Sequence, residues 1–194
     1  MHANWVMHRD LKLPNLLYSN DGVLKVADFG LARYFGSESR PMTPRVVTLW
    51  YRPPELLFGS QVYTESLDMW AVGCIIGELL LQQPLLPGKN EFDQIHRICN
   101  LLGTPNEHTW PGMSKLPQAS LKLPHQPYNN LGQRLSHVSP NGLDLLNRLL
   151  AYDPTRRMTA TEALAHPYFT ESPLPAAQEL MPTFPNSQVP KTPL

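Results

Sequence analysis

The stretch from Tyr63 to Leu81 constrains the fold more than any other part of the 194-residue chain. Apolar side chains recur on nearly every face of a helix built from it, and such a helix is stable only at the centre of a domain. Thr64 is placed to cap the first turn. We therefore predict a central buried helix over 63–81. Its apolar positions are Leu67, Met69, Trp70, Val72, Cys74, Ile75, Ile76, Leu79, Leu80 and Leu81.

Asp68 is the exception on this helix. A carboxylate on a buried element must find hydrogen-bond donors, because an unpaired buried charge is costly. The alternative is a plain first-turn charge that, with Glu65, favours the positive end of the helix dipole. Asp68 is thus a candidate structural residue whose partners lie elsewhere in the chain.

The loop from His8 to Asn15 gathers a carboxylate, an amine and a carboxamide, and Asp28 follows thirteen residues after Asn15. Any one of these residues alone is most simply a solvated surface group. Together they match the needs of phosphoryl transfer, which rests on positioning and on cations held near phosphate oxygens. Asp10 can accept or orient the proton of a hydroxyl. Lys12 offers a compact charge to a phosphate, and Asn15 and Asp28 offer hard oxygens to Mg²⁺.

Two short strands are predicted between these groups, over 16–18 and 23–27. The turn Ser19-Asn20-Asp21-Gly22 joins them, and its Asp-Gly pair is a strong hairpin signal. Such a hairpin brings Asn15 and Asp28 beside each other, one at each end. Two residues that are thirteen positions apart in the sequence would thereby share one site.

A long polar segment follows, from Leu31 to Val47. Loops of this length in compact domains are usually functional or mobile. The segment contains Thr43, and Arg9 and Arg33 lie outside its centre. A phosphate on Thr43 could draw both guanidinium groups into bidentate contacts and order the loop. The alternative is an unmodified surface threonine.

Further helices are predicted over 91–102, closed by Gly103, after Ser139-Pro140, and after the capping-box sequence Thr159-Ala160-Thr161-Glu162. The region 110–135 is punctuated by proline and is expected to be irregular. Residues 171–194 read as a proline-rich tail beyond a domain of residues 1–170. The predicted fold class is therefore mainly α, a helical bundle with a short β-hairpin at its cleft.

The formal net charge is zero, which gives no reason to expect nucleic acid or a membrane surface as a partner. The longest apolar run, 71–81, is too short and too interrupted to span a bilayer. Cys74 and Cys99 lie in apolar helical stretches, so buried thiols are expected rather than a disulfide. An intracellular location, in nucleus or cytoplasm, is the expectation.

The motifs resemble the second half of the protein-kinase signature set: the loop His8-Arg9-Asp10-Leu11-Lys12, then Asp28-Phe29-Gly30, then Pro54-Glu55. Val46-Val47-Thr48-Leu49-Trp50-Tyr51-Arg52 is similar to the end of the activation segment of cyclin-dependent kinases. Pro41-Met42-Thr43-Pro44 and the tail Glu179-Leu180-Met181-Pro182-Thr183-Phe184-Pro185 resemble the PISSLRE branch, with the PITSLRE branch second.

The resemblance implies a proline-directed serine/threonine kinase that uses ATP and Mg²⁺, binds a cyclin and phosphorylates proteins at Ser/Thr-Pro sites. It implies Asp10 as base, Lys12 on the γ-phosphate, Thr48 tying both together, Asn15 and Asp28 as metal ligands, and Leu17 beneath the adenine ring. It implies Thr43 as an activating phosphosite read by Arg9 and Arg33, a substrate-proline pocket of Val46, Val47 and Arg52, hydrogen bonds from the catalytic loop to Asp68, and a buried Glu55–Arg157 pair.

Two departures from the family pattern stand out. Pro53 occupies a position where the family usually has alanine, which an extended backbone would tolerate. The kinase motifs that grip ATP from above would all precede His8, so we expect a C-terminal lobe whose N-terminal lobe is missing and which alone has negligible kinase activity. The alternative is a short form that acts as a non-catalytic substrate- or regulator-binding module.

Overall fold

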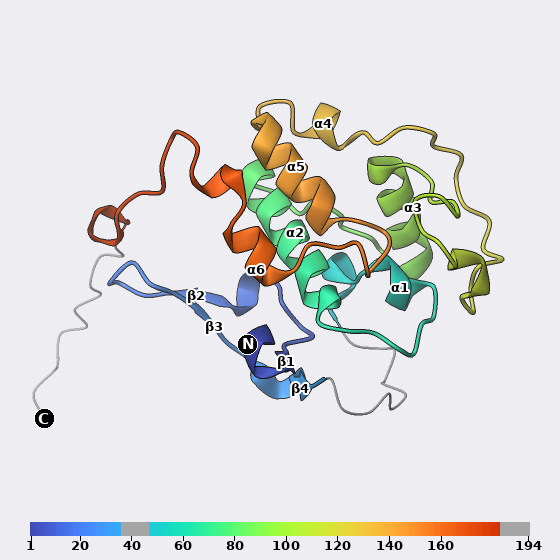
Figure 1. Ribbon diagram of the computed structural model, residues 1–194, viewed down its shortest axis with the longest axis horizontal. Coiled ribbons are helices and arrows are strands. Elements are labelled where there is room, and N and C mark those ends of the chain that lie inside the picture. The colour runs from blue at the N-terminus through green and yellow to red at the C-terminus, as the bar shows by residue number, and fades with distance from the viewer. Residues whose placement is uncertain (36–46, 183–194) are drawn as a thin grey trace, which may run out of the picture.

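The computed structural model describes residues 1–35 and 47–182, and these residues form a mainly helical body with two small sheets at one side (Figure 1). This agrees with the predicted fold class. The α-helices are α1 (Pro54–Leu57), α2 (Ser66–Leu81), α3 (Glu91–Leu102), α4 (Leu131–Arg134), α5 (Pro140–Leu149) and α6 (Ala160–Leu164). The strands are β1 (Val6–Met7), β2 (Leu16–Tyr18), β3 (Leu24–Val26) and β4 (Arg33–Tyr34).

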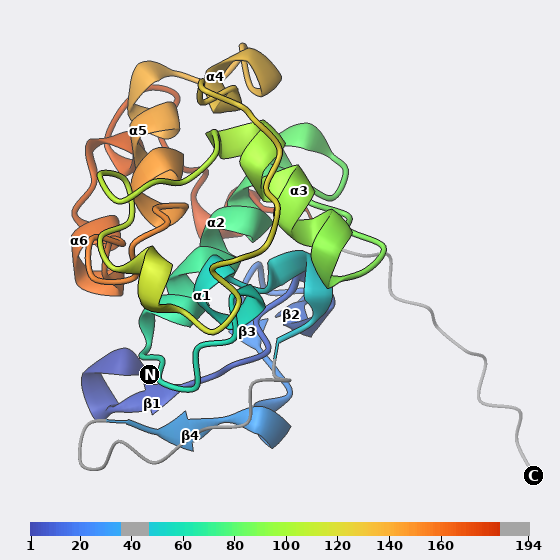
Figure 2. The same cartoon turned by 90° about the vertical axis from the view of Figure 1, so that its right-hand side faces the viewer.

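Helix α2 lies at the centre of the body, as predicted, with α5 packed against it and α3 nearby (Figures 1 and 2). Leu67, Trp70 and Ala71 are at most 1% exposed. The predicted start at Tyr63 is wrong, because the helix begins at Ser66. Thr64 does not cap it in the expected way: its hydroxyl lies 2.9 Å from the Ser66 hydroxyl, and Glu65 occupies the cap position without a side-chain bond.

The other predicted helices, after α2, are present. Helix α3 has the predicted bounds and ends at Gly103, which has a φ of 87°. Ser139 caps α5 through its hydroxyl, and Thr159 and Glu162 form the predicted capping box at α6. Helix α4 was not expected in the irregular region. Its Leu131 is completely buried, as is Leu135 just beyond it, so burial of two leucines orders a turn that proline content alone argues against.

The strands form two antiparallel pairs among the described residues. Strand β2 pairs with β3, with Leu17 opposite Lys25, which is the predicted hairpin. Strand β1 pairs with β4, with Met7 opposite Arg33. Met7 is fully buried, whereas Trp5 just before the strand is 61% exposed. Trp5 precedes β1 and has a left-handed backbone with a φ of 57°, so the alternation of side chains along a strand does not extend to it.

Cys74 and Cys99 are free and buried, as predicted. Burial raises the pKa of the Cys99 thiol to about 11. Among the described residues, none of the helices combines the length and the apolar character needed to cross a lipid bilayer. Beyond residue 170 the described chain is largely exposed and contains one 3₁₀ turn, Gln178–Leu180.

Candidate active site

Asp68 holds the loop that carries Asp10. Its carboxylate is buried and accepts backbone N–H bonds from His8 at 2.7 Å and from Arg9 at 2.9 Å. His2 Nε2 lies 2.9 Å from Asp68 Oδ2 and adds a third contact. The donors expected for a carboxylate on the central helix are therefore supplied by the loop that carries Asp10. His2 is a partner that sequence reasoning missed, and no local motif around it gives a signal.

Arg9 adopts a left-handed backbone with a φ of 66°, directly before Asp10. A non-glycine residue in this region is strained and persists only where its surroundings fix it. The Asp68 contact fixes the backbone, and the side chain is fixed as well: Arg9 Nε donates to Leu31 O at 2.7 Å and Nη1 to Tyr63 Oη at 2.8 Å. The strain therefore sets the direction in which Asp10 points.

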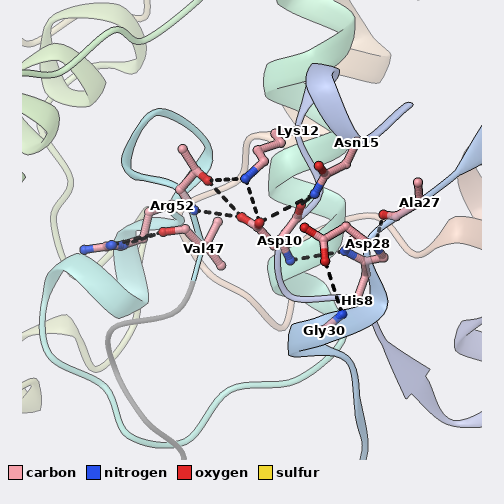
Figure 3. Close-up of polar contacts among 10 residues, drawn as sticks. His8, Asp10, Lys12, Asn15, Ala27, Asp28, Gly30, Val47 and Arg52 are labelled. Atoms are coloured by element: carbon pink, nitrogen blue, oxygen red, sulfur yellow. Dashed lines mark hydrogen bonds and ion pairs between the residues drawn. The ribbon is translucent and has the colours of Figure 1, made fainter. Parts of the chain in front are cut away.

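Asp10 is the centre of a polar cluster (Figure 3). Lys12 Nζ donates to its Oδ2 at 2.7 Å, and the Thr48 hydroxyl donates to its Oδ1 at 2.8 Å. Lys12 Nζ also lies 3.2 Å from Thr48 Oγ1, which closes the triangle. Burial raises the pKa of Asp10, but the hydrogen bonds from Lys12 and Thr48 outweigh it and hold the pKa below its ordinary value. Asp10 is thus kept ionised.

The hairpin places Asn15 and Asp28 at the same end, as predicted. Ala27 N donates to Asn15 O at 2.9 Å, and His8 Nε2 lies 2.9 Å from Ala27 O. Asn15 Nδ2 donates to Asp10 O at 2.9 Å, which leaves its Oδ1 without a hydrogen-bond partner among the described residues. The exposed Asp28 has a φ of 63°, and its Oδ1 lies 3.4 Å from Gly30 N. Within the described part of the chain, Asn15 Oδ1 and Asp28 Oδ2 therefore remain without a hydrogen bond.

The segment after Thr48 is anchored on both sides. Val47 has a φ of 69°, and Arg52 donates to its carbonyl oxygen from Nε at 3.2 Å and from Nη2 at 3.0 Å. Arg52 Nη1 also pairs with Glu91 of α3 at 2.6 Å. Pro53 is extended, with φ −73° and ψ 158°, so its ring causes no conflict.

Glu55 and Arg157 form the predicted buried pair. Two parallel bonds of 2.8 Å join the guanidinium to the carboxylate. The Arg157 side chain is 0% exposed and that of Glu55 is 4% exposed. Segments that are 102 residues apart are joined here.

Glu78 is a polar partner that sequence reasoning missed. Tyr51 Oη donates to its Oε2 at 2.6 Å, and burial together with this bond raises the pKa of Tyr51. In the sequence, Glu78 only interrupts the apolar run 71–81. A second carboxylate besides Asp68 on a largely buried helix was the available signal.

Gln94 is a second missed residue, fully buried in α3. Its Oε1 accepts from Gly88 N at 3.0 Å, and the Trp50 indole donates to Gly88 O, also at 3.0 Å. Together with Arg52–Glu91, this network attaches the segment after Thr48 to helix α3.

Some predicted residues are not joined to this group. Thr43 and Val46 lie outside the described residues, and Arg33 is exposed on β4. Leu17 is 55% exposed on the hairpin. Within residues 1–35 and 47–182, no cluster of three or more His, Cys, Asp or Glu could hold a metal by itself.

The protein kinase domain model matches residues 1–169, so the chain belongs to the protein kinase family.

Within that family the similarity is to cyclin-dependent kinases. Cyclin-dependent kinase 10 of Homo sapiens is 56% identical over 187 residues, covering 96% of this chain and 52% of the relative. Cyclin-dependent kinase 11 of Dictyostelium discoideum is 53% identical over 188 residues, covering 96% and 52%. The chain spans about half the length of the curated relatives it matches.

Two solved structures of kinase complexes are similar to this chain in both fold and sequence. A chain in the structure of the CAK complex from Chaetomium thermophilum bound to ATP-γ-S has a TM-score of 0.87 and 44% identity, and the match covers 95% of this chain and 58% of that one. A chain of the yeast RNA Pol II CTD kinase CTDK-1 complex has a TM-score of 0.87 and 41% identity, with 92% and 60% covered.

Proposed function

We propose that the chain forms the catalytic and substrate-facing part of a proline-directed, cyclin-dependent serine/threonine protein kinase. The observation that carries the proposal is the Asp10 cluster, in which Lys12 and Thr48 bind the two carboxylate oxygens at 2.7 and 2.8 Å. An ionised carboxylate held in this way can accept or orient the proton of a substrate hydroxyl. Lys12, paired with Asp10 and part-exposed, is placed to meet a phosphate oxygen of the same reaction.

ATP and Mg²⁺ are the proposed cofactors. Asn15 Oδ1 and the Asp28 carboxylate fit Mg²⁺, because both are hard oxygen donors and neither is committed to a strong bond within the described chain. The metal would offset the charge of the transferred phosphoryl group. Leu17, exposed on the hairpin near Asn15, is proposed to lie beneath the adenine ring.

The specificity proposal rests on Val47 and Arg52. Because Arg52 donates two bonds to the Val47 carbonyl, that carbonyl is not available to a substrate N–H. A substrate residue without an N–H, which is proline, suits such a surface. Val46 is proposed to complete the pocket.

Activation is proposed to use phosphorylation of Thr43, read by Arg9 and Arg33, together with a cyclin. Arg9 is already oriented by Leu31 O and Tyr63 Oη, and Arg33 is exposed on the adjoining strand. Residues 1–170 are proposed as the kinase part and residues 171–194 as a proline-rich tail. The buried free thiols fit a reducing compartment, the nucleus or the cytoplasm.

Radiolabelled phosphate transfer to a Ser-Pro peptide tests the proposal. The 194-residue chain alone should give no transfer above that of its Asp28→Ala variant. Joined to the N-terminal half of a relative and supplied with a cyclin, it should give transfer that Asp10→Asn abolishes. Transfer by the chain alone that Asp28→Ala removes would refute the inactivity proposal. An active joined protein that is indifferent to Asp10→Asn would refute the assignment of Asp10.

A second candidate is a non-catalytic module that binds substrates or regulators. It is favoured by the fact that the segment from Val47 to Arg52 is anchored entirely by this chain, through Glu91 and Gln94. Calorimetric titration with Ser-Pro and Ser-Ala peptides distinguishes the two readings. Proline-dependent binding by the chain alone, combined with an in-frame stop upstream of the Met1 codon, would favour the module.

A further inference from the structure

The hairpin that carries the proposed metal ligands is intrinsically weak. Strands β2 and β3 have three residues each, and Leu17, Leu24 and Val26 are 40% to 60% exposed. An isolated two-stranded hairpin is at best marginally stable in water. Its open end is fixed by His8 and Asn15, as described above. Its turn, at Asp21 and Gly22, needs a support from elsewhere.

Residues 171–181, which we call the strap, supply that support. Gln178 Nε2 donates to the Asp21 carbonyl at 2.8 Å, across 157 residues of sequence. Figure 1 shows this part of the chain, in red, beside the tip of the β2–β3 hairpin. The strap lies beyond residue 169, where the match to the kinase domain ends.

Gly22 shows how closely the strap approaches the turn. Its φ is 76°, and a Cβ atom at this position would lie 2.6 Å from Gln178 O and 3.1 Å from Met181 Cβ. Real Cβ atoms do not approach backbone oxygen so closely, so any side chain at position 22 would displace the strap. Glycine is required here both by the backbone angle and by the neighbour.

The other end of the strap is attached to helix α5. Glu171 accepts a hydrogen bond from the Ser139 hydroxyl and one of 2.7 Å from Asn141 Nδ2, while Glu171 N donates to Pro167 O at 3.1 Å. A carboxylate is favoured at a helix N-terminus. The exposed residues 172–177 therefore join two fixed points, one on the helical body and one on the hairpin.

We propose that the strap positions the hairpin of the catalytic site, with Gln178 as a positioning residue. By holding the turn, it restricts the hinge motion of β2 and β3 about their open end, where Asn15 and Asp28 lie. The strap then contributes to the geometry of the site. The statement about the hairpin stands on geometry alone, and only its consequence for the metal rests on the proposed function.

Amide hydrogen exchange on the full 194-residue chain tests the strap. Gln178→Ala removes the bond to Asp21, and Gly22→Ala forces the strap away. Both substitutions should speed exchange of the backbone amide at position 22, in the turn, and of the Ala27 amide, at the site end, by about fivefold. Amides of α2 should not change. Acceleration at Ala27 separates positioning of the site from a merely local role at the turn.

Gly112→Ala is the matched control. Gly112 has a φ of 81°, yet a Cβ there meets nothing within 4 Å. The Gly112→Ala variant has the same strain of an alanine at positive φ but touches no part of the strap. Amide exchange in the hairpin should therefore stay at the wild-type rate. Glu171→Gln, which weakens the far anchor, should give a smaller acceleration of the same amides. Unchanged Ala27 exchange in both Gln178→Ala and Gly22→Ala, or equal effects in Gly112→Ala, would overturn the proposal.

Titration with Mn²⁺, followed by paramagnetic broadening of amides near Asp28, tests the consequence for the metal. Gln178→Ala should raise the apparent Kd about threefold, because a mobile hairpin holds its ligands less well in place. Broadening that Asp28→Ala does not reduce would refute the proposed metal site and leave the strap intact. Faster hairpin exchange with an unchanged Kd would overturn the positioning role.

Discussion

Replacing Glu55 by alanine should destabilise the chain by about 3–5 kcal/mol, because it leaves a buried guanidinium without its counter-charge. The Arg157 group is fully engaged in the wild-type chain. Its donors meet Glu55 twice and the carbonyl oxygens of Ala151, Ser66 and Tyr152. Its Cζ also lies 5.2 Å from the centre of the Trp70 ring. Loss of Glu55 strips two of these bonds at a site that water does not reach.

Urea denaturation and thermal denaturation, each followed by circular dichroism, measure this loss. In a domain of this size, each kcal/mol moves Tm by about 2–4 °C, so a fall of roughly 6–20 °C is expected. The slope of the transition should not change, since the surface exposed on unfolding is the same.

Glu91→Ala is the control, because it breaks a pair of the same chemistry at a shorter distance. The Arg52–Glu91 separation is 2.6 Å, but the Glu91 side chain is 54% exposed. Exposed pairs contribute about 0–1 kcal/mol. If burial decides the energetics, Glu55→Ala is far the more damaging change. Equal losses in the two variants, or a loss below about 1 kcal/mol for Glu55→Ala, would refute this reasoning.

Two further predictions concern the site and the core. The lowered pKa of Asp10 in the folded chain means that its contribution is present above about pH 3.9 and disappears as the pH falls through the folded value. The fall in urea midpoint between pH 6 and pH 2 should therefore be smaller in Asp10→Asn, and an unchanged fall would show that Lys12 and Thr48 do not stabilise the carboxylate. Gly73→Ala on α2 would place a Cβ 2.9 Å from Leu150 Cδ2 and should cost about 1–3 kcal/mol. Gly132→Ala on α4, whose Cβ would meet nothing closer than 3.8 Å, should be neutral or stabilising; comparable melting temperatures for the two variants would argue against tight packing at Gly73.

The sequence carried enough information for elements whose cause is local. The Asp-Gly turn fixed the hairpin, Gly103 ended α3, and Thr159 with Glu162 marked the start of α6. These signals lie within a few residues of the structure they produce. The Asp68 contacts were also foreseeable, because a carboxylate on a buried helix has to find donors.

Features that depend on tertiary contact were missed. Helix α4 exists because Leu131 and the adjoining Leu135 fill the core, which local composition does not reveal. The error at Thr64 is local instead, because its hydroxyl lies 2.9 Å from that of Ser66, two residues on. The Tyr51–Glu78 bond, the Gln94 Nε2 bond to Trp50 O and the strap on Gly22 join segments far apart in sequence. No periodicity or spacing encodes such contacts.

Arg9, Asp28 and Val47 share a feature with a wider consequence. All three have φ between 63° and 69°, and they lie on three separate segments around Asp10. Each left-handed non-glycine residue costs about 1–2 kcal/mol, so roughly 3–6 kcal/mol of backbone strain is stored in these three residues. Selection for heat resistance alone would drive these positions toward glycine and release the strain. Thermal stability and the backbone geometry of the site are therefore opposed in this chain. The packing of the buried helices offsets the strain at the site.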